Sequence, residues 1–164
     1  MAYYLNIDEV YQVGVEIEEN GRDFYEAAAA STADPDVKKL CQELAAWETR
    51  HVEVFEKLRQ DLPAAAREGG AFDPADEERQ YLRAAADDHV FRKNTDIAAL
   101  VAKCQTPQAI IDLAIQFEKD SVVYYSAMKQ LMPVCEACGS IDALIDEELR
   151  HIGMLTAWKQ RAQP

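Results

Sequence analysis

The sequence contains little glycine and proline, six residues of each in 164, and no apolar run as long as the roughly 18 residues that cross a bilayer. Glycine and proline interrupt helices most strongly, whereas the helix formers alanine, glutamate, leucine and glutamine are plentiful here. This composition predicts an all-α protein. A chain of this length is most simply one domain, spanning residues 1–164, with a substantial core.

Basic residues are also scarce, because 17 Lys and Arg stand against 30 Asp and Glu, for a formal net charge of −13 at pH 7. This charge argues against nucleic acid and against an anionic membrane surface as partners. The first residues, MAYYLNIDEV, lack the basic and apolar segments of an export signal. We therefore expect a cytoplasmic protein, whose four cysteines stay reduced instead of forming a disulfide framework.

One pattern occurs twice in the chain, with the two copies 100 residues apart and no gap between equivalent positions. Each copy has a glutamate, a tyrosine seven residues later, and a Glu-x-x-His motif that begins 30 residues after the first glutamate. The first copy contains Glu18, Tyr25, Glu48 and His51, and the second contains Glu118, Tyr125, Glu148 and His151. Residues i and i+3 share one face of a helix, so each motif presents both side chains on the same side. The chain therefore reads as two copies of one helical hairpin.

Capping residues and prolines mark where the helices begin and end. The first hairpin is expected over about 6–60, with a cap at Asn6 and a second helix that starts at Asp34-Pro35. The second hairpin is expected over about 107–162, after the cap Thr106-Pro107. Between them lies a crossover of about 61–106, with helical segments through 73–91 and 95–103. A long crossover between two antiparallel hairpins is the ferritin-like variant of the four-helix bundle.

The glutamates and histidines of both motifs interrupt stripes that are otherwise apolar, at positions 37, 41, 44, 48, 51, 55 and 58 and again 100 residues later. An ionised carboxylate in an apolar core costs several kcal/mol, and four of them together would repel one another. Two divalent cations would cancel four carboxylates. Carboxylate oxygen and imidazole nitrogen suit iron and manganese, and zinc also accepts them. The pattern therefore predicts a dinuclear metal site.

The segments VEIEENGRDFY, AAWETRHVEVF, AIQFEKDSVVYY and IDEELRHIGML resemble the rubrerythrin-like proteins of the ferritin-like superfamily. The resemblance implies two iron ions, with manganese or zinc as alternatives. It assigns Glu18 and Glu118 as terminal ligands, Glu48 and Glu148 as bridges, and His51 and His151 as one nitrogen ligand each. It also implies that Tyr25 and Tyr125 hydrogen-bond a ligand carboxylate from the opposite hairpin; ordinary core aromatics are the alternative. Glu19 and Glu147 lie one position off the stripe, and we expect their replacement to leave the metal content unchanged.

Full-length rubrerythrins add a rubredoxin domain, whose iron needs two Cys-x-x-Cys motifs, whereas this sequence has the single motif Cys135 to Cys138. We therefore expect an external electron donor. Because no fifth helix is expected after the second hairpin, a ferritin-type cage is not expected either. Cys135 and Cys138 could form a redox pair at a helix start, or could be two half-buried thiols without a redox role. His89, after two aspartates, is expected on a solvated face.

Three functions fit these features. The favoured one is an oxidoreductase that reduces peroxide or oxygen with electrons from the external donor. The alternatives are a ferroxidase that handles iron and a non-catalytic metal-binding bundle. Apolar residues of the crossover exceed what one face of a bundle needs, which indicates a homo-oligomer, most simply a dimer; they are Tyr81, Leu82, Val90, Phe91, Leu100 and Val101.

Overall fold

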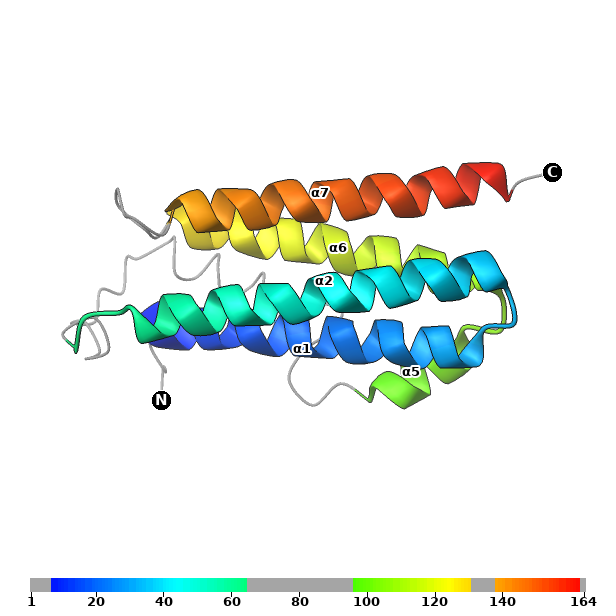
Figure 1. The fold of residues 1–164 in the computed structure, drawn as a ribbon, viewed down its shortest axis with the longest axis horizontal. Coiled ribbons are helices and arrows are strands. Elements are labelled where there is room, and N and C mark those ends of the chain that lie inside the picture. Colours follow the sequence, from blue (N-terminus) through cyan, green and yellow to red (C-terminus); the bar gives the residue numbers. More distant parts are fainter. Residues whose placement is uncertain (1–6, 65–95, 131–137, 163–164) are drawn as a thin grey trace, which may run out of the picture.

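The computed structural model describes residues 7–64, 96–130 and 138–162 (Figure 1). Its helices are α1 (Ile7–Ser31), α2 (Pro35–Gln60), α5 (Ile97–Lys103), α6 (Pro107–Gln130) and α7 (Cys138–Arg161). These described ranges contain no β-strand, which confirms the all-α prediction. They also contain no helix that is both long and apolar enough to cross a membrane.

Local sequence fixes where the helices begin. The Asp34 side chain accepts hydrogen bonds from the backbone N–H of Asp36 (2.9 Å) and of Val37 (3.1 Å), and Pro35 opens α2. In the same way, Thr106 Oγ1 accepts a hydrogen bond from the backbone N–H of Ala109 (3.1 Å) at the start of α6. These caps satisfy amide groups that no helical carbonyl can reach. They therefore fix where α2 and α6 begin.

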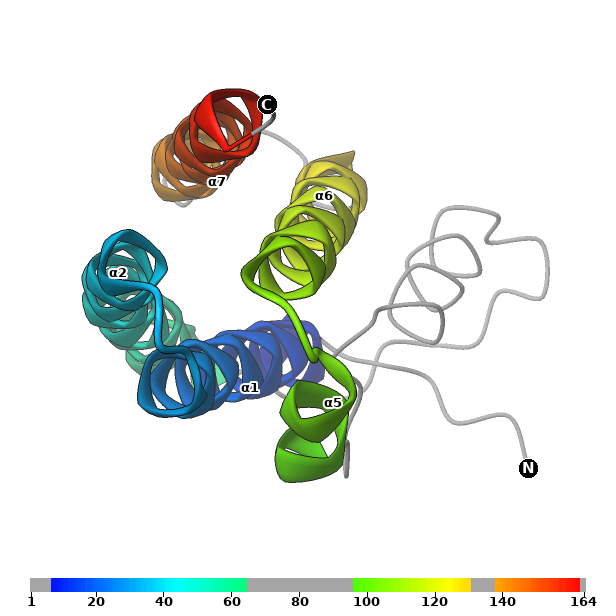
Figure 2. The ribbon, with the colours of Figure 1, turned by 90° about the vertical axis from the view of Figure 1, so that its right-hand side faces the viewer.

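The four long helices run alongside one another as two antiparallel hairpins (Figure 1). α1 packs mainly on α2, and α6 packs mainly on α7, while α1 meets α6 and α2 meets α7 across the interface between the hairpins. Figure 2 looks along this bundle and shows the short α5 on its outside, beside α1. The predicted four-helix bundle of two hairpins is therefore confirmed.

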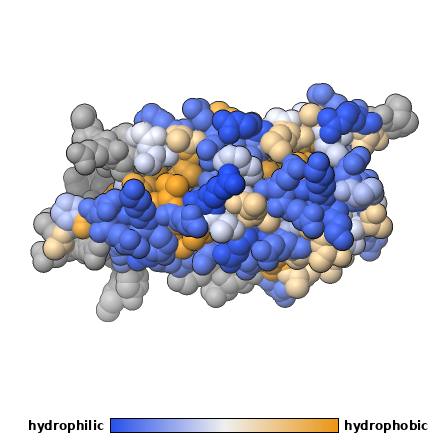
Figure 3. Space-filling view, viewed as in Figure 1, coloured by the Kyte–Doolittle hydropathy of each residue, from blue (hydrophilic) through white to orange (hydrophobic). Residues whose placement is uncertain are grey.

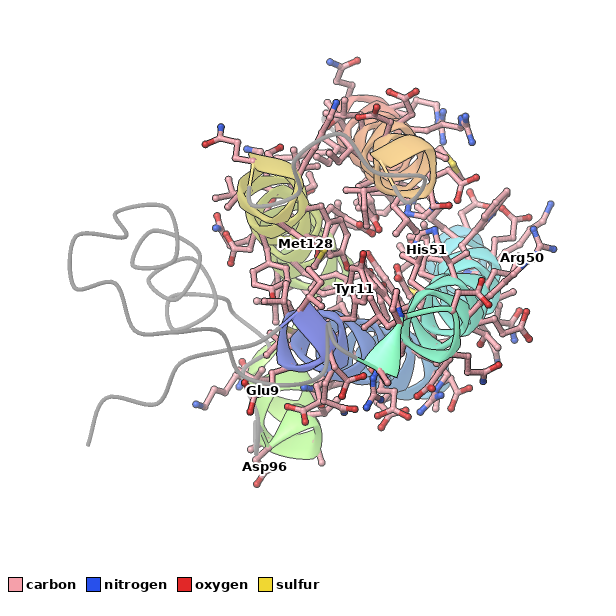
Figure 4. All side chains as sticks on the ribbon, turned by 90° about the vertical axis from the view of Figure 1, so that its left-hand side faces the viewer. Glu9, Tyr11, Arg50, His51, Asp96 and Met128 are labelled. Carbon is pink, nitrogen blue, oxygen red and sulfur yellow. The ribbon has the colours of Figure 1, made fainter. Side chains whose placement is uncertain are left out.

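The core occupies the space that the four long helices enclose. Viewed along the bundle, His51 and Tyr11 point into this space, whereas Arg50 points away from it (Figure 4). On the face drawn in Figure 3, hydrophilic side chains cover much of the helices, and hydrophobic ones show mainly between them. The described stripe residues of α2 and α7 are buried as predicted, except that Leu58 is half-buried. The core is therefore apolar at both ends and polar near its middle.

Several predictions concern residues outside the described ranges. They are the cap Asn6, the helix through 73–91 with Tyr81, Leu82, His89, Val90 and Phe91, the thiol Cys135, and the side chain of Cys138. Of the six crossover residues that suggested a dimer, Val101 is buried and Leu100 packs partly buried against this chain's own core. These two residues therefore give no support to an interface between chains, and the dimer stays a prediction.

Gly21 on α1 gives the bundle a sharp test of packing. A Cβ atom at this position would overlap the ring of Phe117, which is fully buried and packs edge-on against Tyr25 at a centroid distance of 6.1 Å. Because this ring has no room to move aside, Gly21→Ala should lower the free energy of unfolding by about 1–3 kcal/mol. Urea unfolding at one fixed pH and metal content measures the change.

Gly153 on α7 provides the matched control. A Cβ atom there would meet nothing within 4 Å, and the residue is exposed. Gly153→Ala should therefore leave stability unchanged or raise it by up to about 1 kcal/mol, because alanine favours the helix more than glycine does. Equal free energies of unfolding for the two variants would contradict the close packing of Phe117 on α6 against Gly21 on α1.

Candidate metal centre

All six predicted ligands meet near the middle of the bundle, and each long helix contributes to the cluster. α1 supplies one glutamate, α6 supplies another, and α2 and α7 each supply a Glu-x-x-His pair. The four glutamates have no exposed surface and the two histidines are 1% exposed. These residues are Glu18, Glu48, His51, Glu118, Glu148 and His151. The structure therefore brings together the whole set that the repeat singled out.

The cluster divides into two overlapping groups of four side chains. One group is Glu18, Glu48, His51 and Glu148, and the other is Glu48, Glu118, Glu148 and His151. Within each group, one possible ligand atom from every residue lies within 4.8 Å of all the others. Glu48 and Glu148 belong to both groups, as two bridging carboxylates must. Each group then adds one glutamate and one histidine of its own, which is the arrangement expected for two adjacent metal positions.

The donor atoms in the cluster lie close together without satisfying one another. His51 Nδ1 lies 2.9 Å from Glu148 Oε1, 3.3 Å from Glu48 Oε2 and 3.4 Å from Glu18 Oε2. Yet this nitrogen and all four carboxylate oxygens of Glu18 and Glu48 have no hydrogen-bond partner among the described residues. Buried polar atoms without partners are rare and costly in proteins. Divalent cations would satisfy these oxygen and nitrogen donors, so the residues present fit a metal pair.

The electrostatics of the metal-free cluster lead to the same conclusion. Burial, reinforced by neighbouring carboxylates, raises the pKa of Glu48 and of Glu118 well above the ordinary value of 4.5. Burial acts in the same direction on Glu148, but hydrogen bonds with Glu118, His151 and His51 outweigh it and lower the pKa of Glu148. Burial lowers the pKa of His151, but Glu118 and Glu148 outweigh it and raise that pKa to about 10. Without metal, protons therefore supply the positive charge that the cluster requires.

The two tyrosines of the repeat behave differently. The Tyr25 hydroxyl on α1 donates a hydrogen bond to Glu118 Oε1 on α6, which is the contact across the hairpins that the resemblance implied. Tyr125 is buried, but its hydroxyl has no hydrogen-bond partner in the described part of the chain. The matching expectation for Tyr125 is therefore wrong in this structure. Glu18, which is the counterpart of Glu118 in the repeat, lies against His51 instead.

Glu147 belongs to the site, although it was expected to lie outside it. Its Oε2 atom lies 2.9 Å from His51 Nε2, on the side of the ring opposite the cluster, while the side chain is 29% exposed. Glu147 is off the stripe of α7, but α2 lies next to α7 and presents His51 to it. Sequence reasoning missed this contact because the equivalent residue of the first copy is Trp47, so the repeat gave no signal for a carboxylate.

The fold and the cluster define a helical bundle whose buried glutamates and histidines fit a dinuclear metal site. A model of the Rubrerythrin family matches residues 9–159, and the chain belongs to that family. Among solved structures, a Thermotoga maritima protein provisionally described as a ferritin-like diiron-carboxylate protein is similar, with a TM-score of 0.75 and 22% identity. The match covers 99% of this chain and 100% of that one, and it confirms the ferritin-like fold. No curated protein matches.

Replacing a bridging glutamate should remove metal, because each bridge belongs to both groups. We expect wild-type protein to hold about two metal ions per chain and Glu48→Ala or Glu148→Ala to hold fewer than one. The control is Glu19→Ala, which removes an exposed carboxylate next to a ligand. It should retain the wild-type content. Elemental analysis after loading and desalting measures the ratio, and full loading of both bridge variants would contradict the ligand assignment.

The raised pKa values of Glu48 and Glu118 make the metal-free protein sensitive to pH. In the unfolded chain these carboxyls ionise near 4.5, so above that pH the folded state binds more protons than the unfolded state. The free energy of unfolding should therefore fall as pH rises from 5 to 8, by up to about 1.4 kcal/mol per pH unit for each such group.

The loaded protein is the control for this pH dependence, because bound cations take the place of the protons. Its stability should not fall over the same range. Urea unfolding of chelator-treated and loaded protein at several pH values makes the comparison. A stability of the metal-free protein that is flat or rises between pH 5 and 8 would show that the carboxyls are ionised there without metal.

Proposed function

We propose that this protein is an oxidoreductase that holds two iron ions and reduces peroxide or oxygen with electrons from an external donor. The observation that carries the proposal is the pair of overlapping ligand groups that share Glu48 and Glu148. Two ions held by these shared carboxylates could act together on the two oxygen atoms of one small molecule. Oxygen-rich donors with one imidazole per position suit iron, and manganese and zinc are the alternatives.

The six residues would have different roles in such a site. Glu18 with His51 would hold one ion, Glu118 with His151 would hold the other, and the two shared glutamates would bridge them. When bound in the ferrous state, the pair supplies the two electrons that cleavage of an O–O bond requires. The apolar residues on both sides of the cluster exclude bulk water, and Phe55, Ile111 and Leu144 are among them.

Two groups lie next to the ligands, and one of them holds a proton near the reaction. The Tyr25 hydroxyl keeps its proton, because burial and then the charge of Glu118 raise its pKa well above 10. It donates that proton in a hydrogen bond to Glu118. On the other side of the cluster, Glu147 reaches solvent and contacts His51 Nε2. This contact connects a buried ligand with a partly exposed carboxylate.

The electron donor and the assembly also stay proposals. A partner that brings electrons must approach the surface, and Glu147 on α7 is the part of the described site that reaches it. We propose a homodimer from the composition of the crossover alone. Leu100 and Val101 lend it no support, because they pack on this chain's own core. Sedimentation at micromolar concentration separates dimer from monomer.

Rapid mixing of the ferrous protein with an oxidant tests the proposed activity. Fast oxidation by peroxide or oxygen, followed by repeated turnover when a chemical reductant is added, is the expected result. Glu19→Ala should react like wild type, whereas Glu48→Ala should react at least tenfold more slowly because it lacks a bridge. Oxidation that consumes oxygen and releases ferric iron would instead support an iron-handling protein. A ferrous protein inert to both oxidants would support a metal with a structural role only.

A further inference from the structure

We propose that the two metal positions are unequal, because the groups that surround them differ between the two copies. The position held by Glu18 and His51, here called the His51 position, binds its ion more tightly. The position held by Glu118 and His151, here called the His151 position, binds its ion less tightly. This inference rests on the proposed dinuclear site.

The first difference lies behind the histidines. His51 directs Nδ1 at the carboxylates of the cluster, and its Nε2 lies 2.9 Å from Glu147 Oε2. With a metal ion on Nδ1, the ring proton would sit on Nε2, which would donate it to Glu147. A carboxylate that accepts this hydrogen bond fixes the ring orientation and makes the opposite nitrogen a stronger donor. Glu147 is partly exposed and belongs to α7, the neighbour of the helix α2 that carries His51. It therefore acts through the histidine as a positioning residue.

His151 lacks this support. It also directs Nδ1 at the cluster, 3.1 Å from Glu148 Oε2, but its buried Nε2 has no hydrogen-bond partner among the residues described here. The position equivalent to Glu147 is Trp47, whose ring lies 5.9 Å from the His151 ring between centroids. An indole can donate a hydrogen bond but cannot accept one. Arg50 stacks on the indole with its guanidinium carbon 4.5 Å from the ring centre.

The second difference lies behind the terminal glutamates, and it acts in the same direction. The Tyr25 hydroxyl donates a hydrogen bond to Glu118, which withdraws electron density from that carboxylate. Neither carboxylate oxygen of Glu18 has a hydrogen-bond partner within the described ranges, and the Tyr125 hydroxyl has none either. The His51 position thus has an electron-rich histidine and a glutamate that accepts no hydrogen bond from a tyrosine. The His151 position has an unsupported histidine and a weakened glutamate.

Unequal positions imply an order of loading. The first ion occupies the His51 position, and the second completes the pair at the His151 position. At limiting metal the chain holds one ion, and the second ion exchanges faster than the first. A bound first ion repels the second in any two-metal site, so two binding steps alone do not establish the order. Variants of Trp47 and Glu147 establish the order, because each changes the surroundings of one histidine only.

The test is an anaerobic titration with Fe²⁺, followed by calorimetry, on the full chain and three variants. Glu147→Gln keeps the shape of the side chain and removes its charge, and it should weaken the tighter step by about tenfold. Trp47→Glu places a carboxylate behind His151 and should strengthen the weaker step. Asp146→Asn removes an exposed carboxylate next to Glu147 and should change neither step.

Mössbauer spectra of the loaded ⁵⁷Fe²⁺ protein report on each iron separately. A general loss of stability in a variant would not shift the signal of one iron alone. In Glu147→Gln, the signal of one iron should shift and that of the other should stay at its wild-type position. If both binding steps and both iron signals of Glu147→Gln equal those of wild type, the inference is overturned while the dinuclear site stands. If wild-type protein binds fewer than two ions, the proposed function fails first and this inference fails with it.

Discussion

Four carboxylates buried together at the centre of the bundle are the constraint on which the rest of the structure depends. Glu18, Glu48, Glu118 and Glu148 have no exposed surface, so water cannot stabilise their charges. Positive charge must come from within the cluster, either as protons or as metal ions. The apolar residues that fill both ends of the bundle keep the helices close enough for these groups to meet. Burial of ionised carboxylates therefore lowers the stability of the fold, whereas binding of metal ions requires these same carboxylates to be ionised.

Much of the fold and most of the site could be predicted from the sequence. Caps such as Asp34 and Thr106 act within a few residues, and they fix the helix starts wherever the rest of the chain lies. The six candidate ligands could be singled out because the repeat marks each position twice at equal spacing. A stripe on one helix, however, says little about which side chain of a neighbouring helix will face it. Glu147 was missed for this reason, and Tyr125 was given a partner that it does not have.

Small residues place the rings that surround the cluster. Gly14 leaves room for the ring of Phe55, and Gly21 leaves room for that of Phe117. Their counterparts in the second copy are Ala114 and Ser121, which are larger, so the two halves of the core are not packed alike. The two copies are thus alike in their candidate ligands and differ in the residues around them. The two groups of candidate ligands therefore have different surroundings.

The difference between Trp47 and Glu147 depends on the two hairpins belonging to one chain. Each hairpin contributes one outer glutamate, one shared glutamate and one histidine, so two identical hairpins could in principle assemble the same six ligands as separate chains. Such a symmetric pair would carry the same residue at both equivalent positions, and any substitution would appear twice. Covalent linkage removes that restriction. A duplicated and fused sequence can change one half alone, and its two histidines can then acquire different neighbours.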